Sequence, residues 1–434
     1  MTSSAAPPAT GAPYPSARLR GVALAVLTAC VFVVGTAEWV MVGLLPRLSA
    51  SWHRTLPAVG SLVTWYALVV TLAGPLVTAG VLRLARRRAL LVLLGVFTTG
   101  NLAAALSDTF NALVAARMLT ALTHSTTFAA AMVIAIALVP AARRGRAVAA
   151  VTAGWNLATV LGAPLGTWIG DHYGWRATFW TITALAVLVL CAVAALVHPP
   201  IPLQATHPGE EVRGLLRPPV AIVLAIIVIA QAGLFTAYTY VAPLLQKVSG
   251  FTPSAVTTLL ALFGLGAVGG NILGGHLADR FPWAGVCTLL VGLTGVLAAF
   301  SLTSRIRWAA AVTVLILGVI TAALIPLLQD RALAAAPTAA TLVTAISASA
   351  FNLGVASGSQ LGGHALTTGL TLPDLPWIGA LLAGAAALIA AAAARRHRTP
   401  VPRPPCSARA IGAELVCWFR GRSHAPVPRR DPDE

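Results

Sequence analysis

The sequence predicts an all-α polytopic membrane protein, in which twelve transmembrane helices form two pseudo-symmetric six-helix bundles. Three observations predict this fold class. Only 9% of the 434 residues are charged, whereas a soluble protein of this length has about 25% charged residues. Apolar runs of membrane-spanning length recur along the chain, and motifs of the first half return in the second.

The apolar runs are separated by short polar or Pro/Gly breaks, which give the approximate ends of each span. A helix needs about 20 residues to cross a hydrocarbon core of ~30 Å. The first run is too long for the core of a cleavable signal peptide, so we expect it to remain as the first helix. The predicted spans are 21–46, 58–82, 88–107, 110–138, 147–170, 177–198, 219–244, 253–277, 284–303, 308–328, 338–364 and 375–394.

The longest polar break follows the sixth run and divides the chain near its middle. The first residues are rich in Pro, Ala and Ser, and the last are rich in Arg and Pro, compositions typical of disorder. The predicted organisation is a disordered leader (1–20), an N-terminal bundle (21–198), a linker (199–218), a C-terminal bundle (219–394) and a disordered basic tail (395–434).

The net charge of +17 could suggest a nucleic-acid partner, but the positions of the arginines argue against it. They lie in short loops and in the tail, the pattern of topology signals that face anionic lipid. Most Lys and Arg residues fall on the inner side when the N-terminus is cytoplasmic, so we predict that both termini are cytoplasmic. The five cysteines have no disulfide or zinc spacing and are interpreted as free thiols.

An internal repeat relates the two halves of the chain. TAEWVMVGLLPRLS (36–49) matches TAYTYVAPLLQKVS (236–249), and LVTAGVLR (76–83) and WNLATVLGAPLG (155–166) match LGGHLADR (273–280) and FNLGVASGSQLG (351–362). The three matches occur in order and at nearly the same separation. Such parallel repeats place the substrate site between the halves, near the midplane of the membrane.

From residue 21 to 394 the chain resembles the major facilitator superfamily, and most closely its twelve-span drug:proton antiporters, including arabinose-efflux-like and chloramphenicol-resistance-like members. The motifs that carry the resemblance are GTAEWVMVGLLP (35–46), ARMLTALTHS (116–125), GAPLGTWIGDHYGWR (162–176), TYVAPLL (239–245) and GGHLADR (274–280). The resemblance implies the major facilitator fold.

One position departs from the family pattern. The loop signature after the second span normally carries an Asp before its Arg, and here Leu82 precedes Arg83, whereas the second-half copy keeps Asp279 before Arg280. In the family the first-half Asp helps to close the cytoplasmic side. The contact that closes this side is therefore expected to be weaker here or to be made by other groups.

Glu38 lies inside the first span and is the first candidate for function. A carboxylate in hydrocarbon costs roughly 2.5 kcal/mol or more, so it normally faces a watery cavity. The alternative is that Glu38 only reaches up to the interface.

Arg117 lies at a similar depth in the fourth span, and we expect a direct or water-bridged pair with Glu38. The resemblance links an Arg at this place to proton coupling; the alternative is an Arg that only cross-links helices. His124 lies two turns further along the same face and could relay protons, because a His side chain titrates near neutral pH. More often, however, a lone His in a helix is a packed, hydrogen-bonded residue.

Gly162, Pro164 and Gly166 form the small-residue spacing of the fifth span. The glycines let a neighbouring helix approach, and the proline bends its own helix. The resemblance implies an antiporter signature that shapes the cavity wall; ordinary glycine-mediated packing is the alternative.

Polar and aromatic residues within apolar spans are the candidate substrate contacts, although Asn and Gln also join helices. They are Trp65, Tyr66, Trp155, Asn156, Gln231, Tyr238, Tyr240, Asn271, Asn352 and Gln360. Tyr238 occupies the repeat position of Glu38, so the acid exists in one half only.

The favoured function is proton-coupled efflux, by alternating access, of a small amphipathic compound such as an antibiotic. A sugar or nucleoside exporter, or a proton symporter for uptake, is the alternative. An enzyme is disfavoured because HExxH and phosphate-loop motifs are missing and the loops are short. A sensor or scaffold would need the basic tail as a docking segment. We expect no cofactor beyond the proton gradient, and a monomer in a bacterial cell membrane whose partners are substrate, protons and lipid.

Overall fold

The computed structural model describes residues 16–81, 84–140, 143–197, 218–336 and 340–396. Within these ranges the chain is helical, and twelve helices are long and apolar enough to cross a membrane. The prediction of a twelve-span all-α fold is therefore confirmed. Leu82, Arg83 and nearly all of the predicted leader, linker and tail lie outside the described residues, so the predictions made for them and for the domain boundaries stay predictions.

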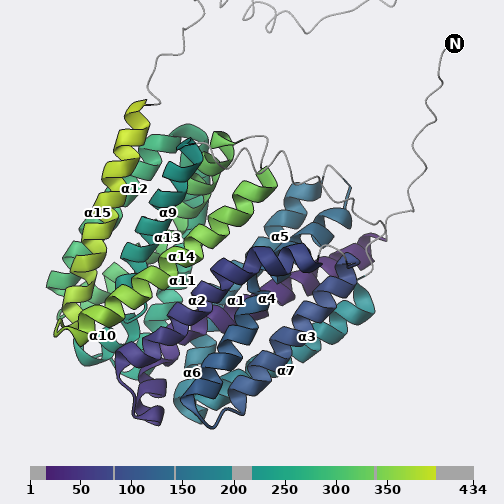
Figure 1. Cartoon of the computed structure of the whole chain (residues 1–434), viewed down its shortest axis with the longest axis horizontal. Coiled ribbons are helices and arrows are strands. Elements are labelled where there is room, and N and C mark those ends of the chain that lie inside the picture. The colour runs from purple at the N-terminus through teal and green to yellow at the C-terminus, as the bar shows by residue number, and fades with distance from the viewer. Residues whose placement is uncertain (1–15, 82–83, 141–142, 198–217, 337–339, 397–434) are drawn as a thin grey trace, which may run out of the picture. The chain divides into compact units, whose positions relative to one another are not determined.

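The first six spans occupy the purple-to-blue part of Figure 1. The fifth is divided into an α-helix, a π-helical turn and a second α-helix. The bounds are α1 (Ala17–Trp52), α2 (Leu56–Val81), α3 (Arg86–Ala105), α4 (Phe110–Ala137), α5 (Arg144–Leu157), η2 (Ala158–Gly162), α6 (Ala163–Tyr173) and α7 (Trp175–Leu196).

The last six spans run from teal to yellow in Figure 1. The bounds are α9 (Pro218–Tyr238), α10 (Val241–Lys247), α11 (Pro253–Arg280), α12 (Pro282–Thr303), α13 (Arg307–Ala335), α14 (Ala340–Thr367), η4 (Leu372–Asp374) and α15 (Leu375–Arg396). Thr109 and Thr252 begin α4 and α11 by accepting a backbone N–H in the first turn, the ordinary role of a threonine N-cap.

The first and seventh spans share a sequence repeat but differ in shape. α1 continues through Pro46 to Trp52 and is longer than predicted. The seventh span breaks between α9 and α10 at Thr239 and Tyr240. Pro243 explains the break, because a proline has no N–H for the carbonyl four residues earlier and its ring clashes with that group; the carbonyl here belongs to Thr239.

Two hydrophobic cores underlie the two halves. One core is built mainly from α1, α3, α4 and α7, and the other mainly from α9, α11, α12, α13 and α15. The halves meet where α2 lies beside α14, which Figure 1 also shows, and where η2 and α6 contact α11. The candidate site lies between these contacts.

Candidate functional site

Glu38 of α1 lies beside two polar groups contributed by other helices. Its side chain is 16% exposed, and its Oε2 lies 3.5 Å from Nε2 of His124 on α4. The other ring nitrogen of His124, Nδ1, lies 2.9 Å from the hydroxyl of Tyr66 on α2. Three helices thus contribute a continuous row of polar groups, Glu38, His124 and Tyr66.

Arg117 of α4 completes this cluster without pairing directly with Glu38. Its side chain is 1% exposed, and its guanidinium carbon lies 4.5 Å from the centre of the Tyr66 ring. Among the described residues, no carboxylate lies within ion-pair distance of Arg117. The predicted direct pair is therefore not formed; instead, an aromatic face stabilises the cation.

A small cavity connects Glu38 to Arg117. Its volume is about 20 Å³, enough for roughly one water molecule. Oε2 of Glu38 and both Nε and Nη1 of Arg117 are buried and make no hydrogen bond to the described residues. The cavity is lined by Glu38, Trp39, Met41, Val42, Val63, Tyr66, Ala67, Arg117, Phe235 and Val355. This arrangement fits the water-bridged form of the predicted pair.

The local structure of α4 explains why its two polar side chains face inward together. Arg117 and His124 are seven residues apart, which is two helical turns and returns to the same face. Between them, Thr120 donates to the carbonyl of Arg117 at 2.7 Å and Thr123 donates to that of Thr120 at 2.9 Å. These hydroxyls are satisfied within the helix and do not compete for Glu38.

Trp39 is the centre of an aromatic cluster that joins the two halves. Its ring lies 6.5 Å from that of Trp155, between centroids, and 6.0 to 6.3 Å from the rings of Phe235, Tyr238 and Phe263. Such edge and tilted arrangements are the favoured geometries of aromatic pairs. Because Trp39 directly follows Glu38 in α1, the aromatic cluster and the polar cluster share one wall.

The remaining candidate substrate residues fall into four groups. Asn156 and Asn271 bond to each other at 2.9 Å across the halves. Gln231 and Asn352 are buried, and each has a side-chain carbonyl oxygen without a partner among the described residues. Tyr240 is fully buried and donates to the carbonyl of Ser359, whereas Trp65 and Gln360 are exposed and outside the cluster.

The glycines of the fifth span bring α1 close to η2 and α6. A Cβ at Gly162 would lie 2.0 Å from Oγ1 of Thr36, and one at Gly166 would lie 2.6 Å from Cγ2 of Val40. Pro164 follows the π-helical turn, whose geometry often marks a functional site. The close approach supports the helix-packing interpretation of this motif.

The conformational motif at the end of α11 is exposed. Asp279 and Arg280 are the last two residues of that helix. Their first-half counterpart, Arg83, lies outside the described residues. The structure therefore describes only the second-half copy of this motif.

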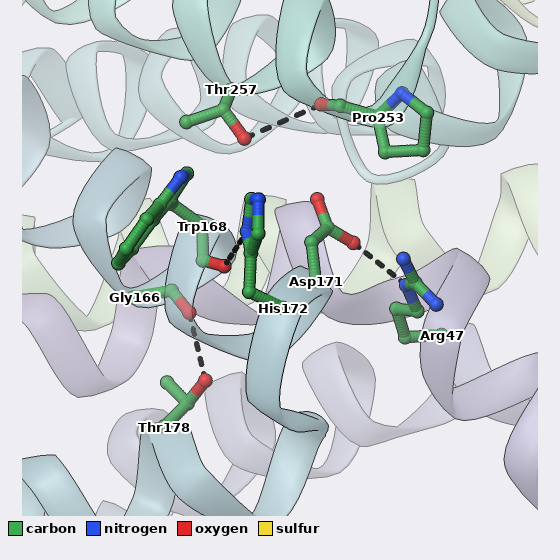
Figure 2. Close-up of polar contacts among 8 residues, drawn as sticks. All are labelled: Arg47, Gly166, Trp168, Asp171, His172, Thr178, Pro253 and Thr257. Atoms are coloured by element: carbon green, nitrogen blue, oxygen red, sulfur yellow. Dashed lines mark hydrogen bonds and ion pairs between the residues drawn. The ribbon is translucent and has the colours of Figure 1, made fainter.

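An ion pair joins α1 to α6 beyond the close contacts that Gly162 and Gly166 make with α1. Nε of Arg47 donates to Oδ1 of Asp171 at 2.8 Å (Figure 2). Nearby, the hydroxyl of Thr178 on α7 donates to the carbonyl of Gly166 at 2.7 Å. The segment of the fifth span from Gly166 to Asp171 is thus bonded both to α1 and to α7.

Sequence reasoning missed the hub residue Trp39 and its partners Phe235 and Phe263. An aromatic residue beside a buried acid was a usable signal for Trp39. The two phenylalanines gave none, because an apolar ring in an apolar helix is the ordinary composition of a span. Tyr66, predicted as a substrate contact, lies in the polar cluster and lines its cavity.

The geometry described so far is that of a polar cluster and an aromatic cluster between two helical halves. A family model described as Major Facilitator Superfamily matches residues 27–359. The chain belongs to this superfamily. It is a secondary transporter with the major facilitator fold and not an enzyme, as predicted.

Relatives and solved structures agree with this assignment. The chain is 35% identical over 368 residues to the inner membrane transport protein YdhP of Escherichia coli strain K12, covering 84% of this chain and 94% of that protein. It is 35% identical over 341 residues to the uncharacterized MFS-type transporter YfhI of Bacillus subtilis, covering 79% and 86%. A bacterial homologue of the human lysosomal transporter Spinster shares the fold, with a TM-score of 0.67, 16% identity and coverage of 88% and 96%.

Proposed function

We propose that the chain is a proton-coupled antiporter that exports a small amphipathic organic compound, as drug:proton antiporters do. The observation that carries this proposal is the placement of Glu38: a mostly buried carboxylate that lines a cavity with Arg117 and lies 3.5 Å from His124. A group that exchanges a transported proton must be buried, able to change its charge and close to the substrate path.

The exchange follows from competition for one site. Protonation of Glu38 removes its negative charge from the cavity, and loss of that proton restores it. A substrate that binds better when Glu38 is charged therefore drives the proton off, and the two ligands favour different states of one two-state element. Arg117 keeps a positive charge beside the cavity in both states, and His124 is the neighbouring group through which the proton passes.

The aromatic cluster supports the class of substrate. Trp39, Trp155, Phe235, Tyr238 and Phe263 present large apolar faces with few polar atoms. Pockets of this composition suit amphipathic organic molecules of modest size. A sugar would need more hydrogen-bonding groups in the same space, which makes a sugar or nucleoside exporter the second candidate.

The relatives support a membrane location for this chain. YdhP is described as an inner membrane transport protein, and we propose a bacterial inner membrane for this chain too, with both termini in the cytoplasm and the carrier acting as a monomer. Its partners would be the substrate, protons and lipid.

The test is proton flux in inside-out vesicles with an acid interior. We expect one or more compounds from a panel of antibiotics and metabolites to release protons from wild-type vesicles and to release none from Glu38→Gln vesicles. Asp108→Asn is the matched control, because the side chain of Asp108 is 95% exposed, and it should behave as wild type. A symporter would give proton movement of the opposite sign, and equal release from Glu38→Gln and wild type would remove Glu38 from the mechanism.

A further inference from the structure

Tyr66 contacts two members of the polar cluster with two different parts of its side chain. Its hydroxyl lies 2.9 Å from Nδ1 of His124, and its ring face supports Arg117 at 4.5 Å. Its ring also meets that of His124 edge-on, with 5.8 Å between centroids. The side chain is buried, so neither contact is shared with bulk water.

The hydroxyl decides what His124 presents to Glu38. A neutral imidazole carries one N–H, and the hydrogen bond made by one ring nitrogen determines the role of the other. When the Tyr66 hydroxyl donates to Nδ1, the N–H is on Nε2, the nitrogen that lies 3.5 Å from Oε2 of Glu38. Although Oε2 makes no hydrogen bond to it, a polar N–H at this short distance favours the charged form of the carboxylate through its dipole.

The groups that face His124 come from four helices. Glu38 is on α1, Tyr66 is on α2, and Arg117 is on α4 with His124 itself. Trp155 of α5 packs against the imidazole with 5.4 Å between ring centroids and carries no titratable group. The Tyr66 hydroxyl is thus the hydrogen-bond partner of Nδ1 within this set.

The helix that carries Tyr66, α2, is also one of the helices through which the two halves meet. Six residues before Tyr66, the carbonyl of Gly60 accepts a hydrogen bond from Ser359 on α14 at 3.2 Å. Five residues after it, Thr71 donates to the carbonyl of Ser349 on α14 at 3.3 Å. Tyr66 therefore lies between two hydrogen bonds that link α2 to α14.

We propose that Tyr66 is a positioning residue for proton exchange: its hydroxyl fixes the N–H of His124 on the nitrogen that faces Glu38, and so links the charge of Glu38 to the α2–α14 contact. The proposal rests on the proposed function, in which Glu38 carries the exchanged proton. It differs from a substrate-binding role for Tyr66, because it requires the hydroxyl and acts only through His124.

The test follows the protonation of Glu38 in the full chain reconstituted in liposomes, and it needs no substrate. Infrared difference spectra recorded across pH report the carboxylic acid C=O band, and the part of the band that disappears in Glu38→Gln belongs to Glu38. In Tyr66→Phe, which keeps the ring beneath Arg117, the midpoint of this band should move toward alkaline pH by about 1 unit, because the N–H of His124 is then no longer held on the nitrogen nearest the carboxylate. Tyr173→Phe, at a tyrosine that is 72% exposed, should titrate as wild type.

A second background shows whether the effect passes through His124. In His124→Phe, whose ring can neither accept from Tyr66 nor present an N–H to Glu38, the further change Tyr66→Phe should leave the midpoint where His124→Phe alone puts it. An equal shift in both backgrounds would overturn the proposal, since the hydroxyl would then act on Glu38 directly or through Arg117. A wild-type midpoint in Tyr66→Phe would also overturn it, as would the absence of any band that Glu38→Gln removes.

A third variant avoids any loss of packing. Site-specific 3-fluorotyrosine at position 66 makes the hydroxyl a stronger donor to Nδ1, so the Glu38 band should move toward acid pH, opposite to Tyr66→Phe. A shift of the same sign in both variants would overturn the proposal. Failure of the antiport proposal is recognised separately, because Glu38→Gln vesicles would then transport normally while the infrared band still responded to position 66.

Discussion

Arg117 is held by an aromatic ring and not by a carboxylate. A desolvated cation on an aromatic face is stabilised by about 2 kcal/mol or more, and the guanidinium lies 4.5 Å from the centre of the Tyr66 ring. This arrangement has a consequence for Glu38. Its charge can change without breaking an ion pair to Arg117, so protonation and deprotonation do not require the arginine to leave its place.

The ion pair between Arg47 and Asp171 gives a prediction at the scale of single residues. The Asp171 side chain is only 7% exposed, whereas that of Arg47 is 46% exposed. Arg47→Gln should therefore lower the unfolding free energy by about 1 to 3 kcal/mol, because it leaves a buried carboxylate without its charged donor.

The double variant Arg47→Gln/Asp171→Asn is the informative control for this pair. Removing both charges leaves no uncompensated group, so its melting temperature in detergent should lie above that of Arg47→Gln alone. Additive losses from the two substitutions would contradict this account of the pair.

At the scale of helices, the fifth span is shaped by its contact with α1. A π-helical turn precedes Pro164, and small residues on the same side allow the two helices to touch. The seventh span shows the other effect of proline, since Pro243 divides it into α9 and α10. Both irregularities lie next to the aromatic cluster, where helix rotation decides which rings meet.

Gly162→Ala tests the close approach of the fifth span to α1. The added Cβ would lie 2.0 Å from Oγ1 of Thr36, so the helices must separate, at a cost of about 1 to 3 kcal/mol. Thermal melting in detergent measures the loss. Gly95→Ala on α3 is the control, because nothing lies within 4 Å of a Cβ there, and it should not lower stability.

A compensating substitution sharpens this test. Adding Thr36→Ala removes the hydroxyl but leaves a Cβ at 2.9 Å, so the double variant should recover part of the lost stability. If Gly162→Ala melts like Gly95→Ala, the two helices are not in tight contact in the membrane protein.

At the scale of the molecule, the two halves meet through α2 and α14. Thr71 and Ser349 lie in contact across this seam, with Thr71 Oγ1 3.3 Å from the Ser349 carbonyl oxygen. Alternating access requires the halves to move relative to each other. We therefore predict that cysteines at both positions, in a chain whose five native cysteines are replaced, stop transport when oxidised and restore it when reduced.

A cross-link within one half provides the matched control. The hydroxyls of Thr78 on α2 and Thr126 on α4 lie 2.9 Å apart, and both helices belong to the first six spans. Oxidation of cysteines at these two positions should leave vesicle transport unchanged. Equal inhibition by both cross-links would contradict movement at the α2–α14 seam.

The sequence predicted the number of spans, their approximate ends and the presence of Glu38 in the first span, because a bilayer imposes length and apolarity on each helix separately. It also predicted that Glu38 and Arg117 lie near each other, since depth follows from counting residues along a helix. Both line one cavity.

The tertiary structure alone decided which side chains meet. Three contacts show this: Tyr66 with His124, Trp39 with aromatic rings of both halves, and Asn156 with Asn271. Each contact depends on how far the helices are rotated about their axes and on how closely they approach one another. These quantities are set by packing between residues far apart in the chain. In spans that are apolar on nearly every side, the sequence has no periodicity from which helix rotation and helix–helix distance could be predicted. The reason is that lipid-facing and protein-facing positions favour the same apolar side chains.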